Sequence, residues 1–292
     1  MKALHLPALL LALMLLPMQA RAEQPRVQSI TWLLGETPGH TAGSADGVNP
    51  SDWLLPYLRE HWPGVQQVEL LANARRTWQM LGNGEQACSA SSVRTPEREK
   101  MAYFTNTLLG PPLQLIARRE KLSALPRNAA GEIDLARVLA DGHLTGALVE
   151  GRSYGSYIDK LLAQRPDNKS VTLYAASDFG SKIMPMLDIG RADYSIGYDI
   201  AIAEARARNP ASQLFSLPIA GASAPVPAGI ACPRTPWGLA AIRGIDRILG
   251  TPAGAAMLRE ITERWLTPES RQRYGPRLDA FYKERAKPSV IR

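Results

Sequence analysis

Runs that alternate between apolar and polar residues, the pattern of half-buried strands, are separated along this chain by segments with the apolar spacing of helices. The strand-like runs cover residues 27–34, 87–93, 113–117, 145–150 and 170–174, with two further pieces between residues 213 and 234. Helical patterns cover residues 51–62, 155–165, 179–189, 200–208, 237–249 and 252–265. A loop followed by a helix is expected within 125–144, and a short basic helix is expected in the tail. Such alternation is typical of α/β proteins, in which helices cover open sheets.

The segment 77–119 contains the residues that are most informative about chemistry. A helix ends in a glycine-rich turn, and the strand-like run 87–93 follows it. In the next turn Thr95 is a suitable N-cap residue, Pro96 suits the first helical position, and Arg98 comes two residues later. This order brings a guanidinium and unpaired backbone N–H groups to one place, which favours the binding of a small anion.

The same segment resembles the signature of the family 3 periplasmic solute-binding proteins, which have the type II periplasmic-binding fold. In that family a Leu-x-x-Gly helix end precedes a strand, a Thr-x-x-Arg turn, a Phe-Thr or Phe-Ser pair and a first crossing between two lobes. The matching residues are Leu81, Gly84, Thr95, Arg98, Phe104 and Thr105. Ala87 and Val93 depart from the family pattern, which usually has an acid and a hydroxyl residue at these places. The resemblance implies a two-lobe α/β fold with two interlobe crossings.

The resemblance extends in order over nearly all of the chain after residue 22, and it implies how the lobes are divided. We expect lobe 1 to comprise residues 23–112 and 226–292, and lobe 2 to comprise residues 113–225. The small-residue, Pro-rich linker within 213–234 has the composition of an interlobe hinge. A branch of the family with a Cys before the Thr-x-x-Arg turn and an Arg-x-Tyr-Gly loop in lobe 2 is the most similar.

Arg98 is the principal candidate for binding a ligand. The resemblance implies that its guanidinium grips a ligand carboxylate, with Ser91, Ser92 and Val93 of the preceding strand beside it. The alternative is that Arg98 pairs with a neighbouring acid such as Glu97 or Glu99 on the surface, where an ion pair contributes little to stability.

The turn 151–155, Gly-Arg-Ser-Tyr-Gly, is expected to complete the site from lobe 2. Arg152, Ser153 and Tyr154 match the position of a family turn whose backbone N–H groups bind the carboxylate, and a helix N-terminus supplies such donors whatever its side chains. The turn also fits the G-x-S-x-G nucleophile elbow of α/β-hydrolases. A hydrolase needs its His downstream of the Ser, whereas all four histidines, at positions 5, 40, 61 and 143, precede Ser153. We therefore favour anion binding over hydrolysis.

Two further sets of polar residues are candidates for the cleft. Glu36, with Thr37 and His40, follows the first strand, and ligands of open α/β sheets bind beyond the carboxyl ends of strands. The alternative is a solvated loop. Asp199 lies near the place where the resembled family holds a ligand ammonium, so it is a candidate for binding a cation. Alternatively, Asp199 only caps the helix 200–208.

Residues 1–22 are predicted to be a cleaved secretory signal peptide. They contain Lys2, an apolar run from residue 6 to residue 16, and the cleavage sequence Ala20-Arg21-Ala22. The apolar run is too short to span a bilayer. Removal of Lys2 and Arg21 lowers the formal charge from +7 to +5, and modest basicity favours anionic ligands or surfaces. We expect a soluble periplasmic protein without a nucleic-acid partner.

The two cysteines, Cys88 and Cys232, are an even number in a chain expected to reach an oxidising compartment. The resemblance places Cys88 in the strand before the Arg98 turn and Cys232 near the second crossing. A disulfide between them is predicted, and two buried free thiols are the alternative.

The predicted function follows from these features together. The sequence has neither the ligand spacing of a metal site nor a phosphate-binding loop, so no cofactor and no enzymatic activity are expected. We expect a monomeric periplasmic binding protein that captures a small polar or anionic, amino-acid-like solute for an ABC-type permease or a membrane receptor. A scaffold or sensory partner that has lost solute binding is the alternative, and an exported serine hydrolase is less favoured.

Overall fold

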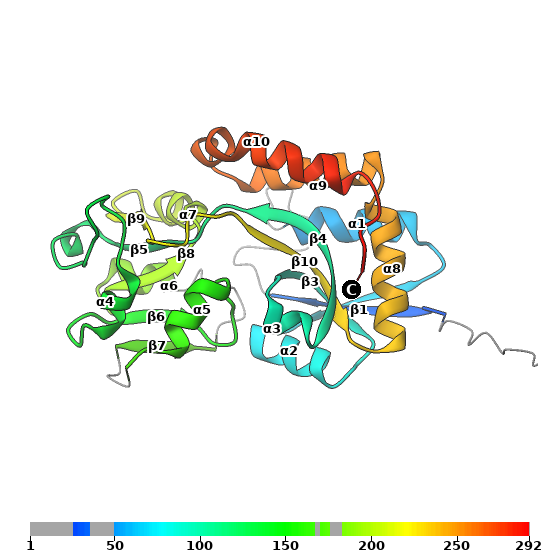
Figure 1. Cartoon of the computed structure of the whole chain (residues 1–292), viewed down its shortest axis with the longest axis horizontal. Coiled ribbons are helices and arrows are strands. Elements are labelled where there is room, and N and C mark those ends of the chain that lie inside the picture. Colours follow the sequence, from blue (N-terminus) through cyan, green and yellow to red (C-terminus); the bar gives the residue numbers. More distant parts are fainter. Residues whose placement is uncertain (1–25, 36–49, 167–169, 176–182, 292) are drawn as a thin grey trace, which may run out of the picture.

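The computed structural model describes residues 26–35, 50–166, 170–175 and 183–291, and these form two lobes, each with a five-stranded sheet (Figure 1). The predicted α/β class is confirmed. The predicted signal peptide, 1–22, and the candidates Glu36, Thr37 and His40 lie outside the described residues.

The sheet of lobe 1 has the strand order β2-β1-β3-β10-β4. Its strands are β1 (Ser29–Leu34), β2 (Gln66–Leu71), β3 (Ala87–Val93), β4 (Ala102–Gly110) and β10 (Val226–Pro233). Strand β1 is parallel to β2 and β3, whereas β10 is antiparallel to β3 and β4. The chain therefore returns to this sheet in its last third, and β10 lies between β3 and β4, which come earlier in the chain.

Helices cover both faces of the first sheet. One face packs on α1 (Ser51–His61), α8 (Pro236–Leu249), α9 (Pro252–Trp265) and α10 (Pro268–Arg285). The other face packs on α2 (Ala74–Gly82), and the short α3 (Pro96–Glu99) connects β3 to β4. The tail, expected to be a short helix, is instead the 18-residue α10. It is long because Leu278 and Tyr282 bury one of its faces in the core of lobe 1.

The sheet of lobe 2 has the order β7-β6-β8-β5-β9. Its strands are β5 (Gln114–Arg118), β6 (Gly146–Val149), β7 (Val171–Tyr174), β8 (Tyr194–Gly197) and β9 (Leu214–Pro218). A 3-10 turn (Arg119–Lys121) follows β5, and the helices are α4 (Leu135–Ala140), α5 (Ser156–Ala163), α6 (Ile183–Asp188) and α7 (Ile200–Arg208). Helices α4 and α5 cover one face, and α6 and α7 cover the other.

The lobes are joined by the two crossings that the resemblance implied. Strand β4 leads through Pro111 and Pro112 to β5, and the chain returns from β9 to β10. Strands β4 and β10 pair antiparallel from Gly110 and Val226 to Ala102 and Pro233, so the two crossings leave lobe 1 side by side (Figure 1). Strand β4 was not predicted from the sequence. Its pattern is obscured because Thr105 and Thr107 are buried within it. The Thr105 hydroxyl donates to Asp246, and the Thr107 backbone carbonyl oxygen accepts from the Tyr282 hydroxyl.

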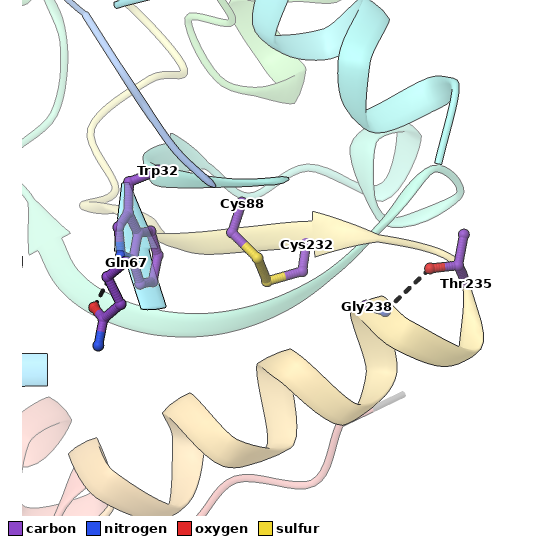
Figure 2. Close-up of a disulfide and its surroundings, with 6 residues drawn as sticks. All are labelled: Trp32, Gln67, Cys88, Cys232, Thr235 and Gly238. Carbon is purple, nitrogen blue, oxygen red and sulfur yellow. Dashed lines mark hydrogen bonds between the residues drawn. A yellow bond between two sulfur atoms is a disulfide. The ribbon is translucent and has the colours of Figure 1, made fainter. Parts of the chain in front are cut away.

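The predicted disulfide is present between Cys88 of β3 and Cys232 of β10 (Figure 2). The two residues face each other on adjacent antiparallel strands with Cα atoms 4.4 Å apart, and both are fully buried above α8. The bond therefore ties the strand that leads to Arg98 to the strand on which the chain returns to lobe 1.

Across the described ranges, none of the helices has both the length and the apolar character that crossing a bilayer requires.

Candidate functional site

A cavity of about 270 Å³ lies between the two lobes. Lobe 1 contributes the ends of β1 and β3 together with α2 and the Arg98 turn, and lobe 2 contributes the ends of β6 and β8 with parts of α6 and α7. Strands β1 and β3 are parallel, as are β6 and β8, so carboxyl ends of strands from both sheets face the same cavity. Ligands of open α/β sheets bind at such positions.

Arg98 enters the cavity from the turn after β3. The hydroxyl of Thr95 accepts a hydrogen bond from the Arg98 backbone N–H, 3.3 Å away, which is the cap expected from the sequence. The guanidinium donates from Nη1 to the Val93 carbonyl oxygen, 3.0 Å away, and from Nη2 to the Gly151 carbonyl oxygen, 3.2 Å away. It also lies over the Trp78 ring, 4.3 Å from the centroid.

The charge of Arg98 has no ion-pair partner within the part of the chain that the structure describes. Glu99, an acid that the surface alternative would pair with it, accepts instead from Arg94 Nε at 2.8 Å. Burial lowers the pKa of Arg98 to about 10, an effect that the Asp159 carboxylate opposes and the Arg152 cation reinforces. The group is therefore charged at neutral pH, partly desolvated and available to an anion.

A second cation, Arg152, lines the same cavity from lobe 2. Its guanidinium faces two aromatic rings, with its central carbon 5.2 Å from the Tyr154 centroid and 5.8 Å from the Tyr198 centroid. Arg152 is close enough to Arg98 for its positive charge to contribute to the lowered pKa of Arg98. The cavity wall is thus cationic where the two lobes meet.

The turn 151–155 binds the carboxylate of Asp159, a residue of the following helix α5. The backbone N–H of Tyr154 donates to Asp159 Oδ1 at 2.7 Å, and the Ser153 hydroxyl donates to the other oxygen of Asp159. The backbone N–H of Gly155 donates to Ser153 Oγ at 3.1 Å. Two of the backbone donors expected to receive a ligand are therefore already occupied by groups of this chain. Ser153 itself lines the cavity, but its bonding partners among the described residues include no histidine.

The serines of β3 form a hydroxyl-rich strip of the lobe 1 wall. Ser89 Oγ donates to the Ser91 carbonyl oxygen at 3.2 Å and lies 2.9 Å from Ser92 Oγ. Ser89, Ser91, Ser92 and Val93 all line the cavity. The sequence candidates Ser91, Ser92 and Val93 are therefore brought together with Arg98, Arg152, Ser153 and Tyr154 around one cavity, and Ser89 joins them.

Asp199 is directed elsewhere. Its carboxylate accepts from the Ile200 N–H at 3.0 Å and from the hydroxyls of Thr267 and Ser270, each at 2.8 Å. It caps α7 and at the same time links lobe 2 to the first turn of α10, and it is not part of the cavity wall. This geometry matches the capping interpretation of Asp199.

Sequence reasoning missed an acid that does line the cavity, Glu204 of α7. Its side chain is partly buried, and burial raises the pKa of its carboxyl group against the opposing charge of Arg208. Spacing could have identified it, because it lies one helical turn after Ile200 and so on the same face of α7. Trp265 was also missed; it lines the cavity and meets the Tyr198 ring edge-on at 4.7 Å between centroids.

The lobes touch directly at the rim of the cavity. Gly151, which has φ +73°, packs its backbone against α2, where an added Cβ would lie 2.9 Å from the Arg75 backbone nitrogen. Arg75 Nη1 also lies 3.3 Å from Glu150 Oε1. Together with the bond from Arg98 to the Gly151 carbonyl, these contacts join the turn after β6 to lobe 1.

Comparison with known proteins establishes the fold. No protein-family model matches the chain, and no curated protein matches its sequence. Solved structures do match. A histidine kinase sensor domain with similarity to periplasmic binding proteins has a TM-score of 0.61 at 15% identity, covering 83% of this chain and 97% of that one. A putative L-cystine ABC transporter from Listeria monocytogenes has a TM-score of 0.61 at 15% identity, covering 84% and 98%.

An amino acid ABC transporter substrate-binding protein from Streptococcus pneumoniae, bound to L-arginine, has a TM-score of 0.57 at 12% identity, with coverage of 82% and 96%. At these identities the likeness concerns architecture. The chain has the two-lobe type II periplasmic-binding fold that the sequence resemblance implied.

Proposed function

We propose that this protein is a solute-binding protein that encloses a small anionic, amino-acid-like solute between its lobes. The observation that carries the proposal is the state of Arg98. Its charged guanidinium faces an interlobe cavity, no carboxylate pairs with it among the described residues, and a second cation, Arg152, lies beside it.

The chemistry of the guanidinium suits this role. Two of its five N–H groups donate to the carbonyl oxygens of Val93 and Gly151, which leaves three for a ligand. A carboxylate can accept two parallel bonds from such a planar group, and charge-assisted bonds of this kind are stronger than neutral ones. Ser91 and Ser92 add hydroxyl groups to the same wall. The carboxylate would replace the water that burial has removed from the guanidinium.

The partner and the compartment are part of the proposal. The similar structures comprise both transporter components and a sensor domain, so we propose that the loaded form is recognised by an ABC-type permease or a membrane receptor. We propose a periplasmic monomer released from the signal peptide 1–22, with lobe 1 formed by 23–112 and 226–292 and lobe 2 by 113–225. The Cys88–Cys232 disulfide supports an oxidising compartment.

The test begins with a thermal-shift screen of amino acids, organic acids and short peptides, because a ligand of the native state raises its stability. Calorimetric titration of the best ligand then compares Arg98→Ala and Arg98→Lys with wild type. The alanine variant removes the charge that pairs with the ligand, so its binding is expected to be weaker by roughly 2–5 kcal/mol. The lysine variant is expected to bind with intermediate affinity, because it keeps the charge but lacks the planar guanidinium that donates two parallel bonds.

Arg94→Ala is the matched control. Arg94 lies on the same turn but pairs with Glu99 and donates to Asn106 at 3.2 Å, outside the cavity wall. Its removal is expected to leave ligand affinity unchanged. Equal, small losses of affinity at positions 94 and 98 would exclude Arg98 from the binding site.

One observation favours a second candidate function, a sensory or scaffolding partner that binds no solute. The bond from Arg98 to the Gly151 carbonyl already joins the lobes with groups of this chain alone. A screen in which no compound shifts the melting temperature, together with unchanged partner binding in Arg98→Ala, would support this candidate over the first.

The hydrolase alternative predicts ester hydrolysis that disappears in Ser153→Ala. We expect no such activity, because the Ser153 hydroxyl is engaged by Asp159 at the start of α5. Ser153→Ala is expected to leave ligand affinity within about tenfold of wild type, because a tenfold change corresponds to the free energy of about one hydrogen bond.

A further inference from the structure

The interlobe cavity contains a charged group that the proposed anion site does not use. Glu204 lines it from α7, and its side chain is partly buried. Within the described ranges of the chain, its carboxylate has neither a hydrogen bond nor an ion pair. Partly buried carboxylates are usually paired, because leaving a charge unpaired in a desolvated place is unfavourable.

Glu204 and the two arginines belong to separate electrostatic neighbourhoods. The charge that acts on the pKa of Glu204 is Arg208, whereas the charges that act on the pKa of Arg98 are Asp159 and Arg152. Coulomb interactions weaken with distance and with screening by solvent. The placement of the elements is consistent with this: Glu204 is on α7, which covers one face of the lobe 2 sheet, whereas Arg152 is on the turn that leads into α5, which covers the other face. Arg98 belongs to the opposite lobe, so the carboxylate enters the cavity from a different element and face than either arginine.

The part of the cavity wall that α6 and α7 form is apolar apart from Glu204. Ile183 and Met184 of α6 line it together with Ile200 and Ala201 of α7. Ile183 and Met184 are buried, and both belong to the core cluster on that face of the lobe 2 sheet. A ligand that binds both the arginines and Glu204 shares the cavity with these hydrocarbon side chains, which favours a ligand with an apolar middle.

We propose that Glu204 is a specificity-determining residue that receives a cationic nitrogen of the ligand, and that the ligand is an extended amino-carboxylate. Its anion binds at Arg98 and Arg152, and its ammonium lies several apolar carbons away at Glu204. This inference rests on the proposed function, since the arginines hold the other end. An amino acid whose two charged groups are attached to one carbon is expected to bind at the arginines alone.

Length-matched probes test the inference in calorimetric titrations of the full mature protein. The amino-alkanoates are γ-aminobutanoate, δ-aminopentanoate and ε-aminohexanoate, and each is compared with the unsubstituted acid of the same carbon number. Norleucine adds a positional isomer of ε-aminohexanoate with its ammonium on the α-carbon. The best amino-alkanoate is expected to bind at least about tenfold more tightly than its alkanoate, a difference of about 1.4 kcal/mol.

Glu204→Gln keeps the shape of the side chain and removes its charge. It is expected to abolish the preference for amino-alkanoate over alkanoate while leaving alkanoate and norleucine affinities unchanged. The control is Glu60→Gln, an exposed acid of α1 outside the cavity wall, which is expected to retain the preference.

A pH series on wild-type protein provides a second readout that needs no variant. The carboxylate accepts a cation only when ionised, and its pKa is raised by burial. The preference for amino-alkanoate is therefore expected above that pKa and is lost as pH falls through it, whereas alkanoate binding does not follow this titration.

The outcomes separate the two proposals. Equal affinity for amino-alkanoates and alkanoates, or a preference that persists in Glu204→Gln, overturns the role of Glu204 and leaves the anion site intact. Binding of neither series, with Arg98→Ala indistinguishable from wild type in the ligand screen, overturns the anion site and the inference together.

Discussion

Gly151→Ala tests whether the rim contact between the lobes sets the closure of the cleft. Gly151 has φ +73°, and an added Cβ would lie 2.9 Å from the backbone nitrogen and 3.1 Å from the Cα of Arg75. These are backbone atoms of the first turn of α2, so they cannot move aside as the end of a flexible side chain would. Relief of the contact requires the two lobes to separate at this point.

The size of the effect follows from these distances. Ordinary contact at 3.4 Å requires a movement of about 0.5 Å, the difference between 3.4 and 2.9 Å. The same movement along the bond from Arg98 Nη2 to the Gly151 carbonyl lengthens it from 3.2 Å to about 3.7 Å, beyond hydrogen-bonding distance. Because the rim is exposed to solvent, we take the low end for a charge-assisted bond, about 1.5 kcal/mol. The ratio of closed to open protein should then fall roughly tenfold.

Gly155→Ala is the control for backbone strain. Gly155 also has positive φ, +87° with ψ 150°, a region that only glycine occupies readily, but the nearest atom to its added Cβ is a Val226 methyl at 3.9 Å. Both variants should lower the melting temperature. Only Gly151→Ala should increase the radius of gyration of the ligand-free protein in small-angle X-ray scattering and weaken ligand binding in titration. Identical scattering and affinity for the two variants would refute a role of this contact in closure.

Three further predictions concern the framework around the site. Replacing Cys88 and Cys232 by alanine should lower the free energy of unfolding by roughly 4–5 kcal/mol, because the bond closes a loop between residues 144 apart; urea unfolding that matches wild type would contradict this. Asp246→Leu should lower the free energy of unfolding by roughly 3–5 kcal/mol in the same assay, because it leaves the buried Arg285 guanidinium, 2.9 Å from Asp246 Oδ1, without a carboxylate to balance its charge; the double variant Asp246→Leu with Arg285→Met should lower it less. Asp199→Ala should lower stability without changing ligand affinity, and the opposite result in unfolding and titration would return this acid to the ligand site.

Local sequence determined where several helices begin. Thr-Pro pairs open α3, α8, α9 and α10, and in each the threonine hydroxyl accepts from the backbone N–H three residues later. A hydroxyl at the N-cap and a proline at the next position act through the nearest turn of backbone. Such signals do not depend on what packs against the helix, so they can be read from the chain alone.

Where the local sequence pattern gave a wrong prediction, contacts with segments distant in the chain determined the structure. Strand β4 does not alternate because Thr105 and Thr107 are buried within it, and the Thr105 hydroxyl bonds to Asp246 of α8 and Arg285 of α10. The tail helix is long because Leu278 and Tyr282 pack in the core of lobe 1, and its buried Arg285 is neutralised by Asp246 of α8. Neither partner is near in sequence. The tail and β4 were therefore misjudged for the same reason, an interaction between segments more than thirty residues apart.

By itself the sequence predicted the α/β class, the order of most of the helices and strands, and the arginine turn at the end of β3. These rest on periodicity, on capping and on a motif whose residues are close together in the chain. The tertiary structure alone decided which acid faces the cavity. Asp199 and Glu204 lie five residues apart, yet the first is taken by Thr267 and Ser270 of α10, while the second is left on the cavity face of α7. The physical reason is that a side chain's role depends on its nearest competing partner, and α10 reaches Asp199 only when the two lobes are assembled.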